Sequence, residues 1–122
     1  MSTALIIDDN RQTADALRQM LDALGVEARV SYGSSPALEL LQTVTPRLIL
    51  LDVNMPGVDG LEVLSFLRRE PRLAVVPVIV ITSDDQPETK RRVMDLGATT
   101  MLIKPATLDR LEDALKKAKI LS

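Results

Sequence analysis

Four short apolar runs stand out along the chain, and a polar residue follows each of them. The runs are residues 4–7, 48–51, 78–81 and 101–103. Their nearly continuous apolar character is typical of strands that are buried on both faces of a parallel sheet. A fifth segment, residues 26–30, alternates apolar and polar positions, so we expect it to form a strand at the edge of the same sheet.

The segments between these strands carry apolar residues at the three- and four-residue spacing of amphipathic helices. The five stripes are Ala14, Leu17, Leu21 and Leu24; Leu38 and Leu41; Leu61, Leu64 and Leu67; the segment from Asp85 to Gly97; and Leu108, Leu111, Leu115 and Ala118. Five repeats of strand and helix predict an α/β protein of the doubly wound, flavodoxin-like class. With the strand of residues 26–30 at one edge, the predicted strand order is 2-1-3-4-5.

Capping residues predict where these helices begin and end. The expected N-terminal caps are Ser35, followed by Pro36; Asp59; and Asp85, with Glu88 three residues later as in a capping box. Gly25 and Gly97 stand where a glycine would end a helix. Pro46 and Pro71 follow the second and third helices, which must stop before them.

Length and composition narrow the class of protein further. The 122 residues, of which 46% are hydrophobic, are enough for one domain, which we expect to span 1–122. A net charge of −2 without charge blocks does not favour nucleic-acid binding, and no apolar run is long enough to span a membrane or serve as a signal peptide. The absence of cysteine rules out disulfides and thiolate metal sites. These features favour a soluble cytoplasmic protein.

The polar residues that follow the strands are the candidate functional residues. Asp8 and Asp9 follow the first strand, Asp52 the third, Thr82 the fourth and Lys104 the fifth. The carboxyl ends of parallel strands share one edge of the sheet, where ligands bind, so these side chains should converge. Each one alone has an ordinary explanation, as a helix cap, a strand residue or a surface charge. Their joint placement favours a site.

The sequence resembles the receiver domain of two-component response regulators over its whole length. The resemblance rests on Asp8-Asp9, residues 52–60, Thr82-Ser83, Gly97-Ala98 and Lys104-Pro105. It implies the same doubly wound fold and strand order, a phosphoacceptor function in a phosphorelay, and a cis peptide bond between Lys104 and Pro105. Several of these motifs are short and weak alone, but together they are specific.

By resemblance, each candidate residue has a role. Asp52 would accept the phosphoryl group; Asp9, Asp52 and the backbone carbonyl of Asn54 would bind Mg²⁺, with Asp8 acting directly or through water; Thr82 and Lys104 would contact the phosphoryl oxygens. The chemistry agrees, because clustered carboxylates repel an anionic phosphoryl group unless a hard cation neutralises them. Charge on the transferred group is spread over three oxygens, which metal, hydroxyl and ammonium can share.

The resemblance also implies partners. The chain contains no histidine, so a phosphohistidine donor must belong to another protein, either a histidine kinase or a histidine phosphotransfer protein. A downstream protein or effector domain would bind the segment from the fourth strand to the fifth helix, and phosphorylation would change the affinity of this binding. Small phosphodonors are an alternative source of the phosphoryl group.

Two positions depart from the family pattern. Met101 stands where many members have an aromatic residue that rotates during activation, so aromatic rotation cannot be the switch here. Ala106 stands where many members have phenylalanine. Asp84, two residues after Thr82, is expected to influence water access to the phosphoryl group.

Three other functions fit parts of the pattern. An aspartate-nucleophile phosphatase similar to the haloacid dehalogenase group uses a comparable residue set, but carries an Asp-x-Asp motif after its first strand instead of adjacent aspartates. A docking module could keep the fold without phosphorylation, although the intact residue set argues against it. A flavin carrier would suit the fold, but the acidic loop after the first strand is unsuited to a phosphate.

Overall fold

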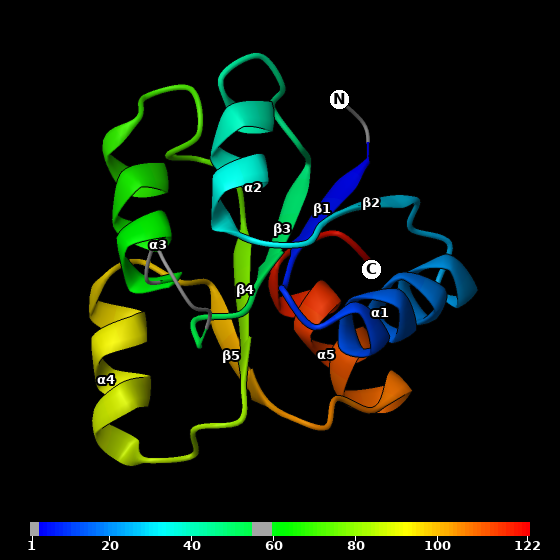
Figure 1. Ribbon diagram of the computed structural model, residues 1–122. Coiled ribbons are helices and arrows are strands. Elements are labelled where there is room, and N and C mark those ends of the chain that lie inside the picture. Colours follow the sequence, from blue (N-terminus) through cyan, green and yellow to red (C-terminus); the bar gives the residue numbers. More distant parts are fainter. Residues whose placement is uncertain (1–2, 55–59) are drawn as a thin grey trace.

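A computed structural model describes residues 3–54 and 60–122 as five strands and five helices in alternation (Figure 1). The elements are β1 (Ala4–Ile7), α1 (Arg11–Ala23), β2 (Ala28–Ser31), α2 (Ser34–Leu41), β3 (Leu48–Leu51), α3 (Gly60–Arg69), β4 (Val78–Thr82), α4 (Pro87–Asp95), β5 (Thr100–Ile103) and α5 (Leu108–Lys117). Within the described ranges, no helix combines the length and the apolar character needed to cross a bilayer.

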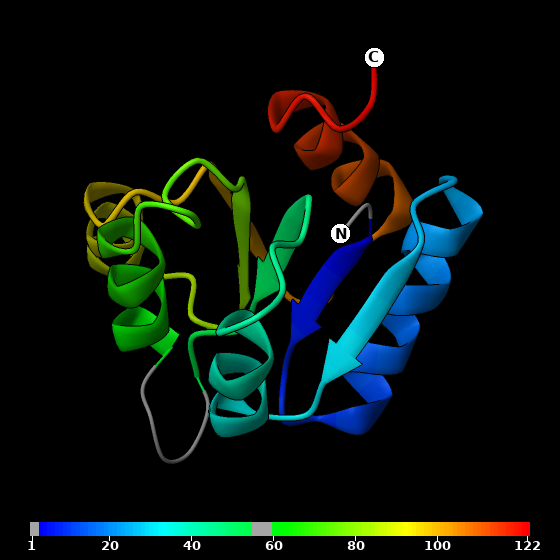
Figure 2. The same ribbon diagram turned by 90° about the horizontal axis from the view of Figure 1, so that it is seen from above.

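The strands form one parallel sheet in the order β2-β1-β3-β4-β5. Ala4 of β1 is in register with Ala28 on one side and Leu48 on the other, so that β1 lies between β2 and β3 (Figure 2). The two outer strands, β2 and β5, each pair with one neighbour. The predicted fold class and strand order are therefore confirmed. The edge strand begins two residues later than predicted, at Ala28, while Val26 is already buried in the core.

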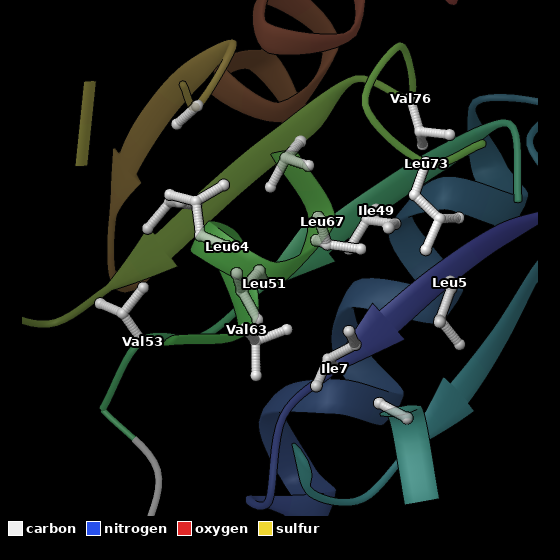
Figure 3. Packing of buried hydrophobic residues seen from close by; sticks show 14 of the residues in the cluster. Leu5, Ile7, Ile49, Leu51, Val53, Val63, Leu64, Leu67, Leu73 and Val76 are labelled. Atoms are coloured by element: carbon white, nitrogen blue, oxygen red, sulfur yellow. The ribbon is translucent and has the colours of Figure 1, made fainter. Parts of the chain in front are cut away.

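Successive side chains of the central strands point to opposite faces of the sheet and form two apolar layers. On one face, Leu5, Ile7, Ile49 and Leu51 pack against α2, α3 and α4 (Figure 3). On the other, the alternate residues of the same strands pack against α1 and α5, which lie side by side in Figure 1. Because the central strands are buried on both faces, their sequences are apolar throughout.

Two of the predicted helix starts are wrong. The second helix begins at Ser34, with Gly33 (φ +141°) at the capping position, instead of after Ser35. Pro36 is tolerated inside the first turn because the first amide groups of a helix have no intrahelical acceptor. The fourth helix begins at Pro87 with Gln86 as its cap.

The capping box predicted for Asp85 and Glu88 is absent for a related reason. Proline suits the first helical position, since its fixed φ is already helical and its missing N–H would have no partner there. Gly25 (φ +81°) and Gly97 (φ +101°) follow the ends of α1 and α4 in the left-handed conformation, as predicted. The predicted cap at Asp59 lies outside the described residues.

Arg68, on α3, ties together three segments that lie on one side of the sheet. Its guanidinium donates to the carbonyl of Gly97 at 2.9 Å and to the carbonyls of Ala74 and Val76 at 3.1 and 2.9 Å. These bonds hold the loop before β4 and the end of α4 against α3. Partial burial lowers the pKa of Arg68, yet an arginine remains charged at any physiological pH.

We expect Arg68→Ala to lower the free energy of unfolding by about 1.5–3 kcal/mol, the usual value for hydrogen bonds to a charged group. Urea denaturation followed by circular dichroism measures the loss. The control is Arg69→Ala, which removes an exposed guanidinium with one long bond to the Ser65 carbonyl and should change stability by less than about 0.5 kcal/mol. Equal losses in the two variants would contradict the role given to Arg68.

Candidate functional site

The sheet brings the predicted site residues together at the carboxyl ends of its strands. Asp8 follows β1, Asp52 follows β3, Thr82 ends β4 and Lys104 follows β5. Asp8, Asp52 and Thr82 are buried, at 1%, 5% and 0% relative exposure, whereas Asp9 is exposed. Polar side chains buried this deeply require partners, because an unsatisfied one costs several kcal/mol or more.

Three carboxylates form a compact acidic cluster. Asp8, Asp9 and Asp52 each offer an oxygen, and the three oxygens lie within 4.8 Å of one another. Carboxylate oxygens are the ligands that hard cations such as Mg²⁺ and Ca²⁺ prefer. The exposed Asp9 leaves the cluster accessible, so the triad is suited to a metal ion.

Lys104 supplies the positive charge of the site. Its Nζ lies 3.1 Å from Asp8 Oδ2 and 3.5 Å from Asp52 Oδ2. The side chain therefore reaches from the end of β5 over β4 to the ends of β1 and β3, as expected from the strand order. The Lys104-Pro105 peptide bond is cis, as the family resemblance implied.

The two oxygens of Asp52 have different surroundings. Oδ1 accepts a hydrogen bond from the backbone N–H of Asn54 at 3.0 Å, while Oδ2 faces Lys104. Burial raises the pKa of Asp52 and the neighbouring Asp8 adds to this; the Asn54 N–H and Lys104 oppose it without cancelling it. The ionised carboxylate is therefore held in the folded protein at a cost in stability.

This cost has a measurable pH dependence. A raised carboxyl pKa means that the folded state binds the proton more tightly than the unfolded state, so stability falls as pH rises through the two pKa values. In metal-free buffer we expect Asp52→Asn to be more stable than wild type at neutral pH. The advantage should disappear as pH falls below about 4, where the unfolded carboxyl is protonated. Urea denaturation at a series of pH values, with chelator present, measures it, and a pH-independent difference would contradict the assignment.

Thr82 takes part in a network that the sequence did not reveal. Its Oγ1 accepts hydrogen bonds from Asn54 Nδ2 at 2.6 Å and from the backbone N–H of Asp84 at 3.1 Å. The sequence pointed to Asn54 only through its backbone carbonyl. Nothing in the spacing of residues 54 and 82 indicates that their side chains meet, because adjacency of β3 and β4 brings them together.

Asp84 points toward α4. Its carboxylate accepts from the Gln86 N–H at 3.0 Å and from Thr89 Oγ1 at 2.6 Å. These two bonds lower its pKa, the bond from Thr89 having the larger effect. Asp84 therefore binds the residue that precedes α4 and a side chain of the first turn of this helix.

The structure shows what surrounds Met101 and Ala106, the two positions that depart from the family pattern. Met101 is half-buried and packs against the apolar layer beneath α2, α3 and α4. Ala106 lines an open groove of about 480 Å³ beside Lys104 and Pro105, bounded on its other side by α1. Where a phenylalanine would occupy space in this loop, the small alanine leaves the groove open.

Comparison with known proteins decides the family. The model of the response regulator receiver domain matches residues 4–116, which include every candidate site residue. The chain belongs to this family. Receiver domains act in two-component signalling and are in general non-catalytic phosphoacceptor regulators. Membership of this family therefore does not favour the phosphatase and flavin-carrier alternatives.

Individual relatives agree with this membership. A probable methanogenesis regulatory protein, FilR2, from Methanothrix harundinacea is 31% identical, with 94% of this chain and 79% of the relative covered. The polar-differentiation response regulator DivK of Brucella anthropi is 29% identical over 93% of each chain.

Solved receiver structures have the same fold. The signal receiver domain of a DNA-binding response regulator from Colwellia psychrerythraea superimposes with a TM-score of 0.90 at 31% identity, covering 99% of this chain and all (100%) of that one. The chemotaxis protein CheY4 of Vibrio cholerae gives a TM-score of 0.88 at 27% identity, with 97% and 98% covered.

Proposed function

We propose that this receiver domain, taken as residues 1–122, is a phosphoacceptor switch whose acceptor is Asp52. The observation that carries the proposal is the placement of the Asp52 carboxylate within the acidic cluster and beside the Lys104 ammonium, at the edge of the sheet. Its Oδ1 is held by a backbone N–H, while Oδ2 lies 3.5 Å from Lys104 Nζ. A nucleophile fixed beside a positive charge suits attack on an anionic phosphoryl group.

In the proposed transfer, an oxygen of Asp52 forms a bond to phosphorus while the bond from phosphorus to the donor breaks. With a phosphohistidine donor, the electron pair of the broken P–N bond stays on the imidazole nitrogen, and the product is an aspartyl phosphate. The chain has no histidine, so this donor belongs to a histidine kinase or a histidine phosphotransfer protein. Transfer of this kind depends mainly on positioning and charge stabilisation.

Asp8, Asp9, Asp52 and the backbone carbonyl of Asn54 are the groups that would hold Mg²⁺. The fit rests on the donor set, since three carboxylate oxygens within 4.8 Å of one another match a hard divalent ion. Such an ion supplies positive charge that offsets repulsion between the carboxylates and the incoming phosphoryl oxygens. Asp8 also forms an ion pair with Lys104, whose Nζ lies 3.1 Å from Asp8 Oδ2. This ion pair keeps the ammonium close to the acceptor, Asp52.

Lys104 and Thr82 would contact the phosphoryl oxygens. Lys104 neutralises negative charge at the site. Thr82 lies at the end of β4, where the connection to α4 begins, so a movement of its hydroxyl can move this connection. We propose that the segment from β4 to α5 alters its affinity for a downstream protein partner or effector domain, in the cytoplasm, where receiver domains typically operate.

Intact-mass measurement after incubation with acetyl phosphate and Mg²⁺ tests this function. We expect one added phosphoryl group per chain with Mg²⁺ and almost none with excess chelator. Unmodified protein under both conditions would refute the phosphoacceptor role. Release of many phosphate ions per chain would instead indicate a phosphatase.

We also expect Thr82→Ala to accept the phosphoryl group but respond to it less. A hydrogen bond to a charged group is worth about 1.5–3 kcal/mol, comparable with the energy gap of a two-state switch. Hydrogen exchange across residues 83–102, with and without phosphorylation, measures the response. In wild type it should lie mostly in α4 and the loop before it, with little change in β5. A full response in Thr82→Ala at equal phosphorylation would refute the role of the hydroxyl.

A further inference from the structure

The side chain of Asn54 joins the acceptor strand to the strand that carries Thr82. Its Nδ2 donates to Thr82 Oγ1 at 2.6 Å, and its backbone N–H donates to Asp52 Oδ1 at 3.0 Å. One residue therefore contacts both the proposed acceptor and the hydroxyl that would respond to it.

The hydroxyl oxygen of Thr82 is fully engaged in this arrangement. A hydroxyl oxygen has two acceptor positions, and the second is used by the Asp84 N–H at 3.1 Å. Thr82 is completely buried. Movement of its hydroxyl toward a group on Asp52 must therefore disturb the bonds from both Asn54 and Asp84.

Asp84 continues the network to α4. The Thr89 hydroxyl donates to Asp84 Oδ2 at 2.6 Å, and the Gln86 N–H donates to Oδ1 at 3.0 Å. The hydrogen bonds thus run without a break from Asp52 through Asn54, Thr82 and Asp84 to Thr89. Thr89 lies in the first turn of α4, so this turn is connected to the position of the Thr82 hydroxyl.

We propose that Asn54 and Thr89 are positioning residues at the two ends of this network. The Asn54 amide is a latch that holds the Thr82 hydroxyl in the resting position, and the Thr89 hydroxyl makes the first turn of α4 follow Thr82. This inference rests on the proposed function and specifies its regulation. Asn54 is exposed, so water can replace its partner when the latch opens, which keeps the opening reversible at small net cost.

Removing the latch should loosen the switch before any phosphoryl group arrives. Asn54→Ala deletes the amide but keeps the backbone N–H and carbonyl, so the groups facing Asp52 and the proposed metal remain. The loss of one hydrogen bond should raise local opening at the start of α4 roughly threefold to fivefold.

Amide exchange in the unphosphorylated protein with chelator present, followed by NMR, tests the latch. We compare wild type, Asn54→Ala, Thr82→Val and the double variant; valine keeps the shape of threonine without the hydroxyl. Each single variant should speed exchange of the Gln86 and Lys90 amides, and the double variant should match Thr82→Val alone. Unchanged exchange in Asn54→Ala, or effects that multiply in the double variant, would overturn the proposal.

A second set of single and double variants tests the end of the network at α4. In a Thr89→Val background, Asn54→Ala should no longer change exchange of the Lys90 amide, while still changing that of the Asp84 amide, which lies nearer the latch. An undiminished effect at Lys90 would show that the coupling bypasses Thr89 and would refute its role.

Asn10→Ala is the matched control for the latch. Asn10 also lies beside the acidic cluster, but its side chain caps α1 by accepting from the Thr13 N–H at 3.0 Å. This variant should speed exchange in the first turn of α1 and leave α4 unchanged. Faster exchange in α4 would mean that any disturbance of the site loosens this helix, and the latch would be rejected.

Failure of the latch and failure of the proposed function are distinguishable. The exchange measurements use protein that is never phosphorylated, whereas the phosphoacceptor role depends on labelling with acetyl phosphate. Exchange of the β1 amides, which reports global unfolding, should speed up in Asn54→Ala by no more than the same roughly threefold to fivefold, because the lost bond destabilises the folded state relative to the globally unfolded state as well.

Discussion

Asp52→Asn should abolish labelling by acetyl phosphate while leaving the fold intact. The amide matches the carboxylate in size, but it lacks the anionic oxygen that would attack phosphorus. The Asn54 N–H that now donates to Asp52 Oδ1 can donate equally well to the amide oxygen, so the backbone at the end of β3 keeps its partner. Intact-mass spectrometry measures the loss, which we expect to be complete.

The matched control for this experiment is Asp22→Asn, an exposed position on α1 away from the cluster. It should be labelled to the same extent as wild type, and proteolysis of the labelled protein should place the phosphoryl group on the peptide containing Asp52. Undiminished labelling of Asp52→Asn would show that another carboxylate is the acceptor.

Asp9→Ala should remove most of the labelling together with its dependence on Mg²⁺. Asp9 is the exposed member of the acidic triad, so its loss disturbs packing less than a change at Asp8 or Asp52. Even with the dielectric constant of water, a unit charge 4 Å from a divalent ion is worth about 2 kcal/mol. We therefore expect Mg²⁺ binding, measured by calorimetry, to weaken by at least about thirtyfold.

Asp85→Ala provides the comparison, because it removes an exposed carboxylate from the same edge of the sheet but lies outside the triad. Its Mg²⁺ affinity should stay within a factor of about two of wild type, since Asp85 offers no oxygen to the triad and salt screens interactions between exposed charges. If Asp9→Ala bound Mg²⁺ as tightly as wild type, Asp9 could not be a ligand.

The fold class was predictable because the pattern of apolar and polar residues in each strand reflects how completely that strand is buried. The segments at residues 4–7 and 48–51 are apolar throughout, and both are fully buried between two helix layers. Residues 26–30 alternate because an edge strand is covered less completely, and β2 is indeed half-buried. Helix starts were less predictable, since Ser35 and Asp85 are good caps by residue type, but Gly33 and Pro87 decided where α2 and α4 begin.

The gathering of the site residues was predictable for a similar reason. In a parallel sheet every strand has its carboxyl end at the same edge, so a polar residue directly after a buried strand must lie there. Sequence order and strand order together placed Asp8, Asp52, Thr82 and Lys104 within reach of one another. The ion pairs of Lys104 with Asp8 and Asp52 agree with that expectation.

By itself, then, the sequence determined the class of fold and which chemical groups share the edge of the sheet, because these depend on local apolar patterns and chain direction. The strand order rested in addition on the family resemblance. Only the tertiary structure decided which atoms are partners. Burial of Asp52 raises its pKa, Asn54 is bonded to Thr82 across 28 positions of sequence, and Arg68 is bonded to Gly97 across 29. Whether such contacts form depends on differences of a few tenths of an ångström in the relative positions of segments far apart in the chain, and no periodicity or spacing in the sequence encodes them.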